Sequence, residues 1–289
     1  MTTLGQWVEG ARPRTLPAAV SPVLAGTGAA AGVDRFRPGL ALLALLVAVA
    51  LQVGVNYAND YSDGIRGTDA DRVGPLRLVG SGVATPRSVL AAALGAFGVA
   101  ATAGLVLAAL TSWWLLLVGA VAILAAWGYT GGSRPYGYRA LGELSVFVFF
   151  GLVATLGTAY VQAGRVPATA VGAGVAVGAL ACAILVANNL RDIPSDDLAG
   201  KRTLAVVLGD RRTRVLYGVL VAVPFLVSVA LAPAAPWSLL VLLAAPLAVA
   251  PLRLVLAGAG GRDLVAVLRA TGRLQLAYAA LLALGLALG

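Results

Sequence analysis

Seven stretches of the chain carry no charged residue and have the length and apolar character of membrane-spanning segments. A spanning helix needs about 20 apolar residues, so two of the stretches are too long for a single span. Turn residues and tryptophans at 111–114 and 233–237 predict a break inside each of these two. The pattern therefore predicts nine transmembrane helices. The uncharged stretches are 15–33, 38–59, 88–133, 144–164, 166–190, 215–252 and 274–289.

The composition agrees with an all-α, polytopic membrane protein. Hydrophobic residues make up 60 % of the 289 and charged residues only 11 %, and the mean hydropathy is +0.92, all far from the balance of a soluble domain. We expect one transmembrane domain over 1–289. The chain does not open with the pattern of a cleavable signal peptide, so we expect the N-terminus to be retained.

The basic residues predict the orientation of the nine helices. If the N-terminus is cytoplasmic, 18 of the 21 Lys and Arg residues fall on the cytoplasmic side, and only Arg35, Arg37 and Arg165 fall outside. The C-terminus is then outside, and the protein is expected in the plasma (inner) membrane. The net charge of +9 suits an anionic lipid leaflet or an anionic substrate better than nucleic acid.

Two acidic stretches interrupt the apolar pattern at equivalent places. NYANDYSDGIRGTDADR begins at Asn56 and NNLRDIPSDDLAGKRT begins at Asn188, each after a long apolar run. Asp60 and Asp192 occupy the same place in the two copies, 132 residues apart. The echo predicts two pseudo-repeats, about 1–140 and 141–289, and places both copies on the cytoplasmic side.

The spacing within each copy points to a metal site. Residues three or four apart share a helix face, so an amide and two carboxylates gather in each copy. Oxygen ligands of this kind suit Mg²⁺, which is usually held by one or two carboxylates while substrate phosphates complete its coordination. The predicted metal-ligating residues are Asn56, Asp60, Asp63, Asn188, Asp192 and Asp196.

Basic residues beside the acids suit a diphosphate leaving group. A diphosphate at a membrane surface flanked by apolar helices implies a lipid tail within the bilayer, as in a polyprenyl diphosphate. Ionisation of its allylic C–O bond would leave a carbocation that aromatic faces can shelter, and Tyr129, at the end of an apolar helix, is the preferred catalytic candidate. The basic candidates are Arg66, Arg72, Arg77, Arg191, Lys201 and Arg202; the other aromatic candidates are Tyr57, Tyr61, Trp127, Tyr136, Tyr138, Phe147 and Phe149.

The scarce residue types exclude several other chemistries. The chain has no histidine, which rules out haem ligation and acid–base relays that depend on histidine. Its one cysteine, Cys182, cannot form an internal disulfide, and its one lysine, Lys201, lies in a polar segment. Glu143 begins the helix after the Tyr129 segment. We expect its negative charge to interact favourably with the positive N-terminal end of the helix dipole.

The chain resembles the UbiA superfamily of intramembrane aromatic prenyltransferases, and most closely the 1,4-dihydroxy-2-naphthoate polyprenyltransferases of menaquinone synthesis. The resemblance runs nearly from end to end and rests on five segments in order. They are ARPRTLPAAVSPVLAG from Ala11, NYANDYSDGIRGTD from Asn56, GPLRLVGSG from Gly74, the segment from Tyr129, and NNLRDIPSDDLAGKRTLAVVLG from Asn188.

The resemblance implies nine helices around a central cavity, Mg²⁺ at the two acidic stretches, and a prenyl tail that leaves sideways into the bilayer. Lys201 and Arg202 resemble diphosphate contacts. The usual third acid of the first motif is replaced by Gly67, and Asp69 resembles the naphthoate-branch version. The implied reaction attaches the polyprenyl group to the naphthoate ring with loss of CO₂ and diphosphate, giving demethylmenaquinone. Arg12, Arg14 and Arg139 are the candidates for the acceptor carboxylate.

Three alternatives remain at this point. A secondary transporter would also show an internal repeat, but it usually carries ionisable residues in mid-membrane. A CDP-alcohol phosphotransferase shares a DxxDG start at Asp60 but needs further residues that this segment lacks. Within the prenyltransferases, the acceptor could instead be another aromatic acid such as 4-hydroxybenzoate. The sequence leaves the oligomeric state open.

Overall fold

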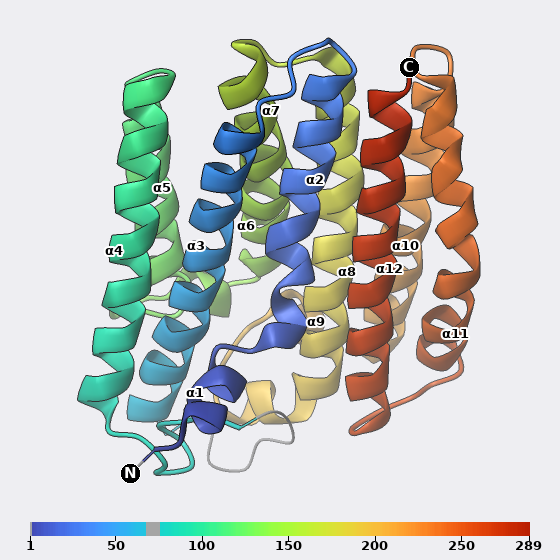
Figure 1. Cartoon of the computed structure of the whole chain (residues 1–289). Helices are drawn as coiled ribbons and strands as arrows, with labels where there is room; N and C mark the ends of the chain where they lie inside the picture. The colour runs from blue at the N-terminus through green and yellow to red at the C-terminus, as the bar shows by residue number, and fades with distance from the viewer. Residues whose placement is uncertain (1, 68–75) are drawn as a thin grey trace.

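The computed structural model describes residues 2–67 and 76–289, and these residues are almost entirely helical. They contain no strand beyond an isolated bridge between Arg139 and Arg202. Figure 1 shows the long helices running side by side, with the two termini at opposite ends of the bundle. The elements are α1 (Leu4–Gly10), η1 (Pro13–Thr15), α2 (Pro17–Ala31), α3 (Pro38–Ile65), α4 (Pro86–Leu110), α5 (Leu115–Gly128), η2 (Tyr136–Tyr138), α6 (Gly142–Val146), η3 (Phe147–Val153), α7 (Ala154–Ala163), α8 (Ala168–Leu198), α9 (Leu204–Leu208), α10 (Asp210–Leu231), η4 (Pro236–Ala244), α11 (Ala245–Leu256) and α12 (Asp263–Ala287).

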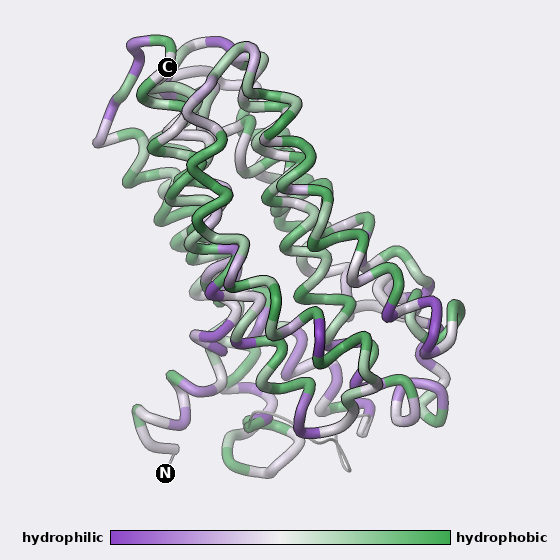
Figure 2. Tube along the Cα trace, turned by 90° about the vertical axis from the view of Figure 1, so that its right-hand side faces the viewer, coloured by the Kyte–Doolittle hydropathy of each residue, from purple (hydrophilic) through white to green (hydrophobic). Residues whose placement is uncertain are grey.

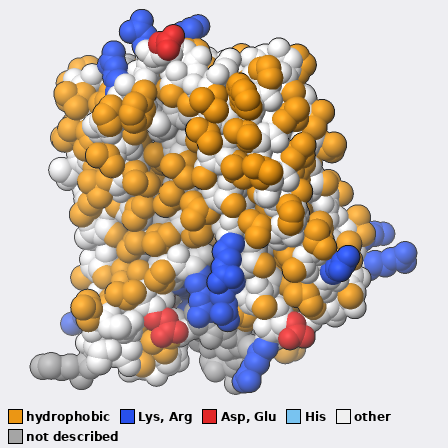
Figure 3. Space-filling model, turned by 45° about the vertical axis from the view of Figure 1, so that its right-hand side comes forward, with side chains coloured by type: hydrophobic (Ala, Val, Ile, Leu, Met, Phe, Trp, Pro, Cys, Tyr) orange, Lys and Arg blue, Asp and Glu red, His pale blue; other side chains and the backbone are white. Residues whose placement is uncertain are grey.

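Seven helical segments of the described chain are long and apolar enough to cross a membrane, so this is a multi-pass membrane protein. Apolar side chains cover the middle of one face, and charged side chains lie toward its two ends (Figure 3). Two shorter helices, α2 and α5, have 15 and 14 residues. The seven segments are α3, α4, Gly142–Ala163, α8, α10, Pro236–Leu256 and α12.

Both breaks predicted inside the long uncharged stretches are confirmed. Helix α4 ends at Leu110 and α5 begins at Leu115, while α10 ends at Leu231 and η4 begins at Pro236. Several helices nevertheless extend past the charges that were expected to end them. Helix α12 begins at Asp263 rather than near 274, because long charged side chains within about three turns of a helix end can still reach water.

The two acidic stretches, which the sequence suggested were polar interruptions after helices, are the last turns of helices. Helix α3 continues to Ile65 and includes Asp60 and Asp63. Helix α8 continues to Leu198, through Pro194, and includes Asp192. A helical course follows from the spacing of three and four residues within each motif, which places its oxygen atoms on one side of the helix.

Small residues let several helices approach closely. A Cβ on Gly26 would lie 2.4 Å from the Thr155 carbonyl oxygen, and one on Gly28 would lie 2.4 Å from Ala283 Cα. Gly151 and Gly178 meet in the same way, with a Cβ on Gly151 falling 2.6 Å from Gly178 Cα. In a lipid bilayer the hydrophobic effect does not hold helices together, because the surrounding lipid is also apolar. Close backbone contacts of this kind stabilise helix association instead. Helix α8 is the most buried of the seven segments.

The segment between α5 and α6, residues 129–141, does not lie at the end of the bundle. Figure 1 shows it crossing the bundle partway along, while α3 and α4 continue past it toward the end where the N-terminus lies. The shortness of α5 explains this position. Hydrophilic positions are concentrated toward the same end of the molecule (Figure 2). We call residues 129–141 the inset segment.

Candidate active site

A cavity of about 830 Å³ opens beside the inset segment. Its lining comes from α1 to α5, the inset segment, the helices between 142 and 163, α8, α12, and the residues that follow α3 and α8. Polar side chains from the two acidic helix ends line one part of it, including Asp63 and Asp196. Alanine, valine, leucine and phenylalanine side chains line the rest, among them Leu51, Val118 and Phe149. The cavity thus joins a polar head region to an apolar region.

Asp63 is the acidic residue of α3 that faces the cavity. It is almost fully buried, and its Oδ1 accepts hydrogen bonds from the Tyr138 hydroxyl and from Lys201 Nζ, the latter at 3.3 Å. Arg77 Nη2 lies 3.8 Å from Asp63 Oδ2. The ammonium group of Lys201 also lies 4.8 Å from the centre of the Tyr138 ring. Asp63 therefore joins α3, the inset segment and the chain after α8.

Asp60 lies one turn earlier and does not line the cavity. Its side chain is inaccessible, and its two oxygens accept hydrogen bonds from the backbone N–H groups of Leu78 (2.8 Å) and Val79 (3.0 Å). In this structure Asp60 holds residues 76–79 against α3, and its role as a metal ligand stays a prediction.

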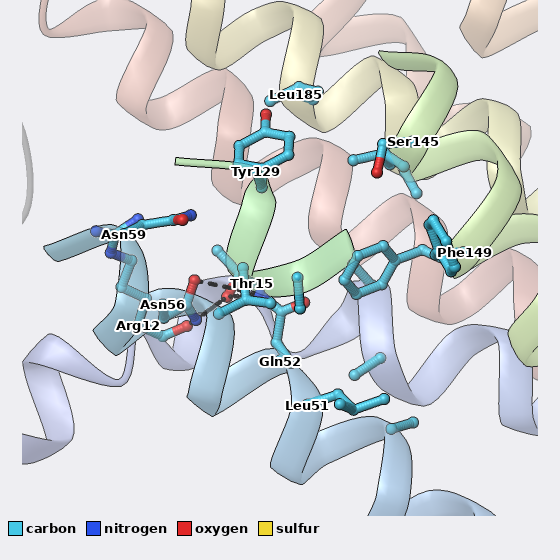
Figure 4. A pocket seen from close by; sticks show the side chains of 18 of the residues that line it. Arg12, Thr15, Leu51, Gln52, Asn56, Asn59, Tyr129, Ser145, Phe149 and Leu185 are labelled. Carbon is cyan, nitrogen blue, oxygen red and sulfur yellow. Dashed lines mark hydrogen bonds between the residues drawn. The ribbon is translucent and has the colours of Figure 1, made fainter. Parts of the chain in front are cut away.

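Asn56 lines the cavity where the N-terminal segment crosses α3. Its Nδ2 donates to the Ala11 carbonyl at 2.8 Å and to Thr15 Oγ1 at 2.9 Å, and its Oδ1 accepts from Gln52 Nε2 at 3.3 Å. Figure 4 shows Gln52, Asn56 and Arg12 gathered around Thr15, with Tyr129 and Phe149 near the same space. Asn56 thus fixes residues 11–15 at the edge of the cavity.

The second acidic motif is held by its own arginine. Arg191 donates to Asp192 through Nε (2.7 Å) and Nη2 (2.8 Å), and its Nη2 also donates to Asn188 Oδ1 at 2.9 Å. Asn188, Arg191 and Asp196 line the cavity, whereas Asp192 does not. The Lys201 N–H donates to the Asp196 carbonyl at 2.7 Å, which brings the chain after α8 back toward the cavity.

The predicted basic residues fall into three groups. Arg14, Arg77, Arg191 and Lys201 line the cavity. Arg66 instead donates to the carbonyls of Thr130 and Gly132, which fixes the inset segment to the end of α3. Arg139 and Arg202 are exposed and lie outside the cavity; their backbones pair, with the Arg202 N–H donating to the Tyr138 carbonyl at 3.1 Å. The predictions for Arg72, Asp69 and Asp71 fall outside the described residues.

Of the aromatic candidates, Tyr129, Tyr136, Tyr138 and Phe149 line the cavity, and the other four do not. Tyr129 and Tyr136 pack edge to face with ring centres 5.6 Å apart. Burial, followed by the negative charge of Asp63, raises the pKa of the Tyr138 hydroxyl. It therefore stays protonated and donates to Asp63. Burial, followed by the charge of Glu143, likewise raises the pKa of Tyr129.

Several cavity residues were not predicted. Gln52 and Asn59 lie four residues before and three after Asn56, on the same side of α3, and Asn59 accepts a 2.6 Å hydrogen bond from Thr130. Their helical spacing from Asn56 indicates the same face of α3. The prediction of site residues depended on charged side chains, and these two side chains are neutral. Asn189, which lines the cavity, was missed for the same reason.

Arg12, one of three candidates for an acceptor carboxylate, has a special position. It lines the cavity, its backbone is left-handed (φ 54°), and its Nη2 is buried with no hydrogen bond to the described residues. A left-handed backbone conformation is unfavourable for a residue with a side chain such as arginine. Leaving a buried guanidinium nitrogen without a hydrogen bond further lowers the stability of the fold. An anionic ligand in the cavity would satisfy this group.

The donor atoms at the polar part of the cavity fit Mg²⁺ in their chemistry. They are carboxylate and amide oxygens, without sulfur or imidazole, which is the set that hard cations prefer. Within residues 2–67 and 76–289, no group of three or more acidic, histidine or cysteine side chains is assembled for a metal. Substrate phosphates usually complete the coordination of Mg²⁺ that one or two carboxylates hold.

Comparison with known proteins places this geometry in context. Residues 19–277 match the sequence model of the UbiA prenyltransferase family. The chain is 60 % identical over its full length to a 1,4-dihydroxy-2-naphthoate octaprenyltransferase of Mycobacterium tuberculosis, covering 99 % of that protein. It is 41 % identical to the protein of the same name from Escherichia coli, over 86 % of this chain and 84 % of that protein.

Solved structures share the fold at low sequence identity. A UbiA homolog from Aeropyrum pernix aligns with a TM-score of 0.69 at 17 % identity, covering 93 % of this chain and 96 % of that one. A UbiA homolog from Archaeoglobus fulgidus, bound to GPP and Mg²⁺, aligns with a TM-score of 0.64 at 16 % identity, covering 94 % and 99 %.

Proposed function

The chain belongs to the UbiA prenyltransferase family, and we propose that it transfers a polyprenyl group from a polyprenyl diphosphate to 1,4-dihydroxy-2-naphthoate. The carboxylate of the acceptor leaves as CO₂, diphosphate is released, and the product is demethylmenaquinone in its reduced, quinol form. The relatives at 60 % and 55 % identity carry the name of this activity.

One observation carries the proposal: a single cavity joins a charged region to an apolar one. Lys201, Arg77 and Arg191 line the charged region together with Asp63 and Asp196. A diphosphate carries the charge that these cations would bind, and the apolar lining suits the first units of a prenyl chain. A soluble acceptor and a lipid donor would thus meet at the border of the two regions.

The acidic residues would hold Mg²⁺ together with the diphosphate. Asp63 and Asp196, which line the cavity, are the carboxylates we assign to the metal, with the Asn56 and Asn188 amides beside them. Bound Mg²⁺ supplies positive charge that stabilises the leaving diphosphate. Asp60 and Asp192, also predicted as ligands, would support the site through their present contacts: Asp60 holds the segment that carries Arg77, and Asp192 holds Arg191.

The remaining residues would guide the chemistry of the prenyl group and the acceptor. Lys201, Arg77 and Arg191 bind the diphosphate oxygens as the C–O bond breaks. Tyr129 and Phe149 present aromatic faces where the allylic cation forms, and they keep water away from it. The exchange of a carboxylate for a prenyl group releases no net proton, so the reaction needs no histidine or cysteine nucleophile.

The same proposal includes the topology. We propose that α2 and α5 cross the membrane with the seven longer segments, which gives nine spans in one domain of two pseudo-repeats, about 1–140 and 141–289. Their inner ends are replaced by η1 and by the inset segment, which explains their length. The opposite positions of the termini (Figure 1) support an odd number of spans. The charge distribution supports a cytoplasmic N-terminus and an active site on the cytoplasmic side of the cell membrane.

An assay of the purified protein tests the function. The protein is incubated with Mg²⁺, one polyprenyl diphosphate and, separately, 1,4-dihydroxy-2-naphthoate or 4-hydroxybenzoate, and products are identified by mass. We expect prenylated, decarboxylated product from the naphthoate only, and none after chelation of Mg²⁺. A product formed only from 4-hydroxybenzoate would replace the acceptor while keeping the reaction class. The absence of product from either acid would contradict the proposal.

A further inference from the structure

Glu143 and Asn189 form a buried pair behind the cavity wall. Asn189 Nδ2 donates to Glu143 Oε1 at 2.9 Å, and both residues are only 8 % exposed. Glu143 lies in the first turn of α6 and Asn189 lies on α8, next to Asn188 of the second acidic motif. Asn189 lines the cavity, whereas Glu143 does not. The pair therefore links a carboxylate outside the cavity lining to an amide that lines the cavity.

The carboxylate decides which way the amide points. Glu143 Oε1 accepts the hydrogen bond from Asn189 Nδ2, so the NH₂ group of Asn189 faces Glu143. The amide oxygen then points away from Glu143. Asn189 Oδ1 forms no hydrogen bond within the described residues, and, unlike Glu143 Oε2, it is not enclosed by protein atoms. Asn189 consequently offers the cavity a hydrogen-bond acceptor.

An acceptor at this position is unsuited to a diphosphate and suited to a hydroxyl group. The side chains that would bind anions are donors, namely Lys201, Arg77 and Arg191. Asn189 lies near the aromatic lining, because the Tyr129 hydroxyl is 3.0 Å from the position of a Cβ on Gly142, the residue before Glu143. A hydroxyl on a flat aromatic ring would find both an acceptor and an aromatic wall here.

We propose that Glu143 is a positioning residue, which holds the Asn189 amide so that its oxygen accepts a hydrogen bond from a ring hydroxyl of the aromatic acceptor. The inference rests on the proposed function and adds a selection for hydroxylated over plain aromatic acids. A ring hydroxyl that donates this hydrogen bond has a more electron-rich oxygen, and this oxygen donates more electron density to the aromatic ring. The ring then attacks the allylic cation more readily.

Exchange of the two side chains tests the pair. In Glu143→Gln the new amide can donate, which allows Asn189 to turn its NH₂ group into the cavity; we expect the KM for 1,4-dihydroxy-2-naphthoate to rise about five- to ten-fold. The KM values for the polyprenyl diphosphate and for Mg²⁺ stay unchanged. In the double variant Glu143→Gln with Asn189→Asp, the Gln amide donates to the new carboxylate, whose second oxygen faces the cavity. We expect the acceptor KM to return to within about three-fold of the wild-type value.

Two measurements separate hydroxyl recognition from a structural role. Naphthoate without hydroxyl groups (2-naphthoate) is tested as a competitive inhibitor, and its inhibition constant is expected to be the same for the wild type and Glu143→Gln. Cys182→Ala is the matched control, because the Cys182 thiol donates only to the backbone carbonyl of Glu143, at 3.1 Å. It should leave the acceptor KM unchanged.

The outcomes that overturn the inference differ from those that overturn the function. An unchanged acceptor KM in Glu143→Gln, or an equal rise in the 2-naphthoate inhibition constant, refutes the positioning role while the wild type remains active. A changed KM for Mg²⁺ in place of the acceptor KM assigns the Asn189 oxygen to the metal instead. If the wild-type protein does not use the naphthoate at all, the proposed function itself is contradicted.

Discussion

Lys201 Nζ lies 3.3 Å from Asp63 Oδ1, which brings together two residues 138 positions apart in the chain. The contact joins the end of α3 to the residues that follow α8, which brings the ends of the two acidic motifs together. The Tyr138 hydroxyl donates to the same oxygen. An ammonium group held in this way lies where a diphosphate and a metal-bound carboxylate would meet.

Replacement of Lys201 by Met should weaken binding of the polyprenyl diphosphate. A hydrogen bond to a charged group contributes about 1.5–3 kcal/mol, which corresponds to a rise of about 10- to 100-fold in the KM for the diphosphate. Lys201→Arg retains the charge and should retain most of the affinity. Steady-state kinetics with the acceptor at saturation provide the measurement. Equal KM values for the wild type and Lys201→Met would exclude a contact with the diphosphate.

Asp60→Ala and Asp63→Ala should differ in their effect on stability. Loss of the Asp60 carboxylate leaves the buried N–H of Leu78 and the partly buried N–H of Val79 without acceptors. An unpaired buried donor costs about 1–3 kcal/mol. Asp63 faces the cavity, where water can replace its contacts. We expect Asp60→Ala to lower the Tm of the detergent-solubilised protein clearly, and Asp63→Ala to abolish activity with a smaller change in Tm. An inactive Asp60→Ala protein with a wild-type Tm would instead indicate that Asp60 binds the metal directly.

Arg12→Gln should raise the KM for the aromatic acid by about 10- to 100-fold, because the acid would lose a charge-assisted hydrogen bond. The side chain of Arg14 is exposed, so Arg14→Gln should have a smaller effect. Arg165→Gln, between α7 and α8 and not part of the cavity lining, is the control that should not change the KM. If Arg14→Gln had the larger effect, the carboxylate would be assigned to Arg14.

The stability of the protein should fall in alkaline solution through Tyr138. Burial and the Asp63 charge raise the pKa of the Tyr138 hydroxyl above its ordinary value of 10.0. The folded state therefore binds this proton more tightly than the unfolded state, and the stabilisation is complete below pH 10 and is lost as the pH rises above it. Tm measured from pH 8 to 11 should fall less steeply for Tyr138→Phe than for the wild type. Parallel curves would show that the phenol does not contribute.

The nine-span topology predicts that the two ends of the bundle face different compartments. Leu198 at the end of α8 is 92 % exposed, and Gly289 lies at the opposite end with the C-terminus. In a Cys182→Ala background, a membrane-impermeant maleimide added to intact cells should label Gly289→Cys and not Leu198→Cys. Both should be labelled after lysis. Labelling of both in intact cells would contradict an odd number of spans.

Much of the fold could be predicted because it depends on the distribution of charge and apolar residues. The membrane class and both helix breaks followed from charge-free stretches and turn residues, with boundaries displaced where helices include charged residues, as at Asp263. The acidic motifs were found because they repeat. Their individual contacts were not predictable, because Asp60 and Asp63 are alike in sequence and differ only in what the chain brings to them: backbone N–H groups for one, Lys201 and Tyr138 for the other.

The contributions of neutral residues were the hardest to predict. Gln52, Asn59 and Asn189 carry no charge, so neither hydropathy nor topology sets them apart, and Arg139 and Arg202 appeared equivalent to Lys201 although they lie outside the cavity. Which side of a segment faces inward depends on packing. In the inset segment, that packing is set by Arg66 and by the Tyr138 backbone.

The size of the cavity limits what the protein can distinguish in its lipid substrate. About 830 Å³ is the volume of a pocket for a drug-sized molecule, enough for an aromatic acid and the first units of a prenyl chain. A long polyprenyl tail would extend beyond it, along the outer surfaces of the helices and among lipid chains. The far end of such a tail would then lie outside the cavity, where the lining residues do not contact it. The number of isoprene units in the quinone would therefore be set by the synthase that makes the diphosphate, and exchange of that synthase should change the tail length without any change in this protein.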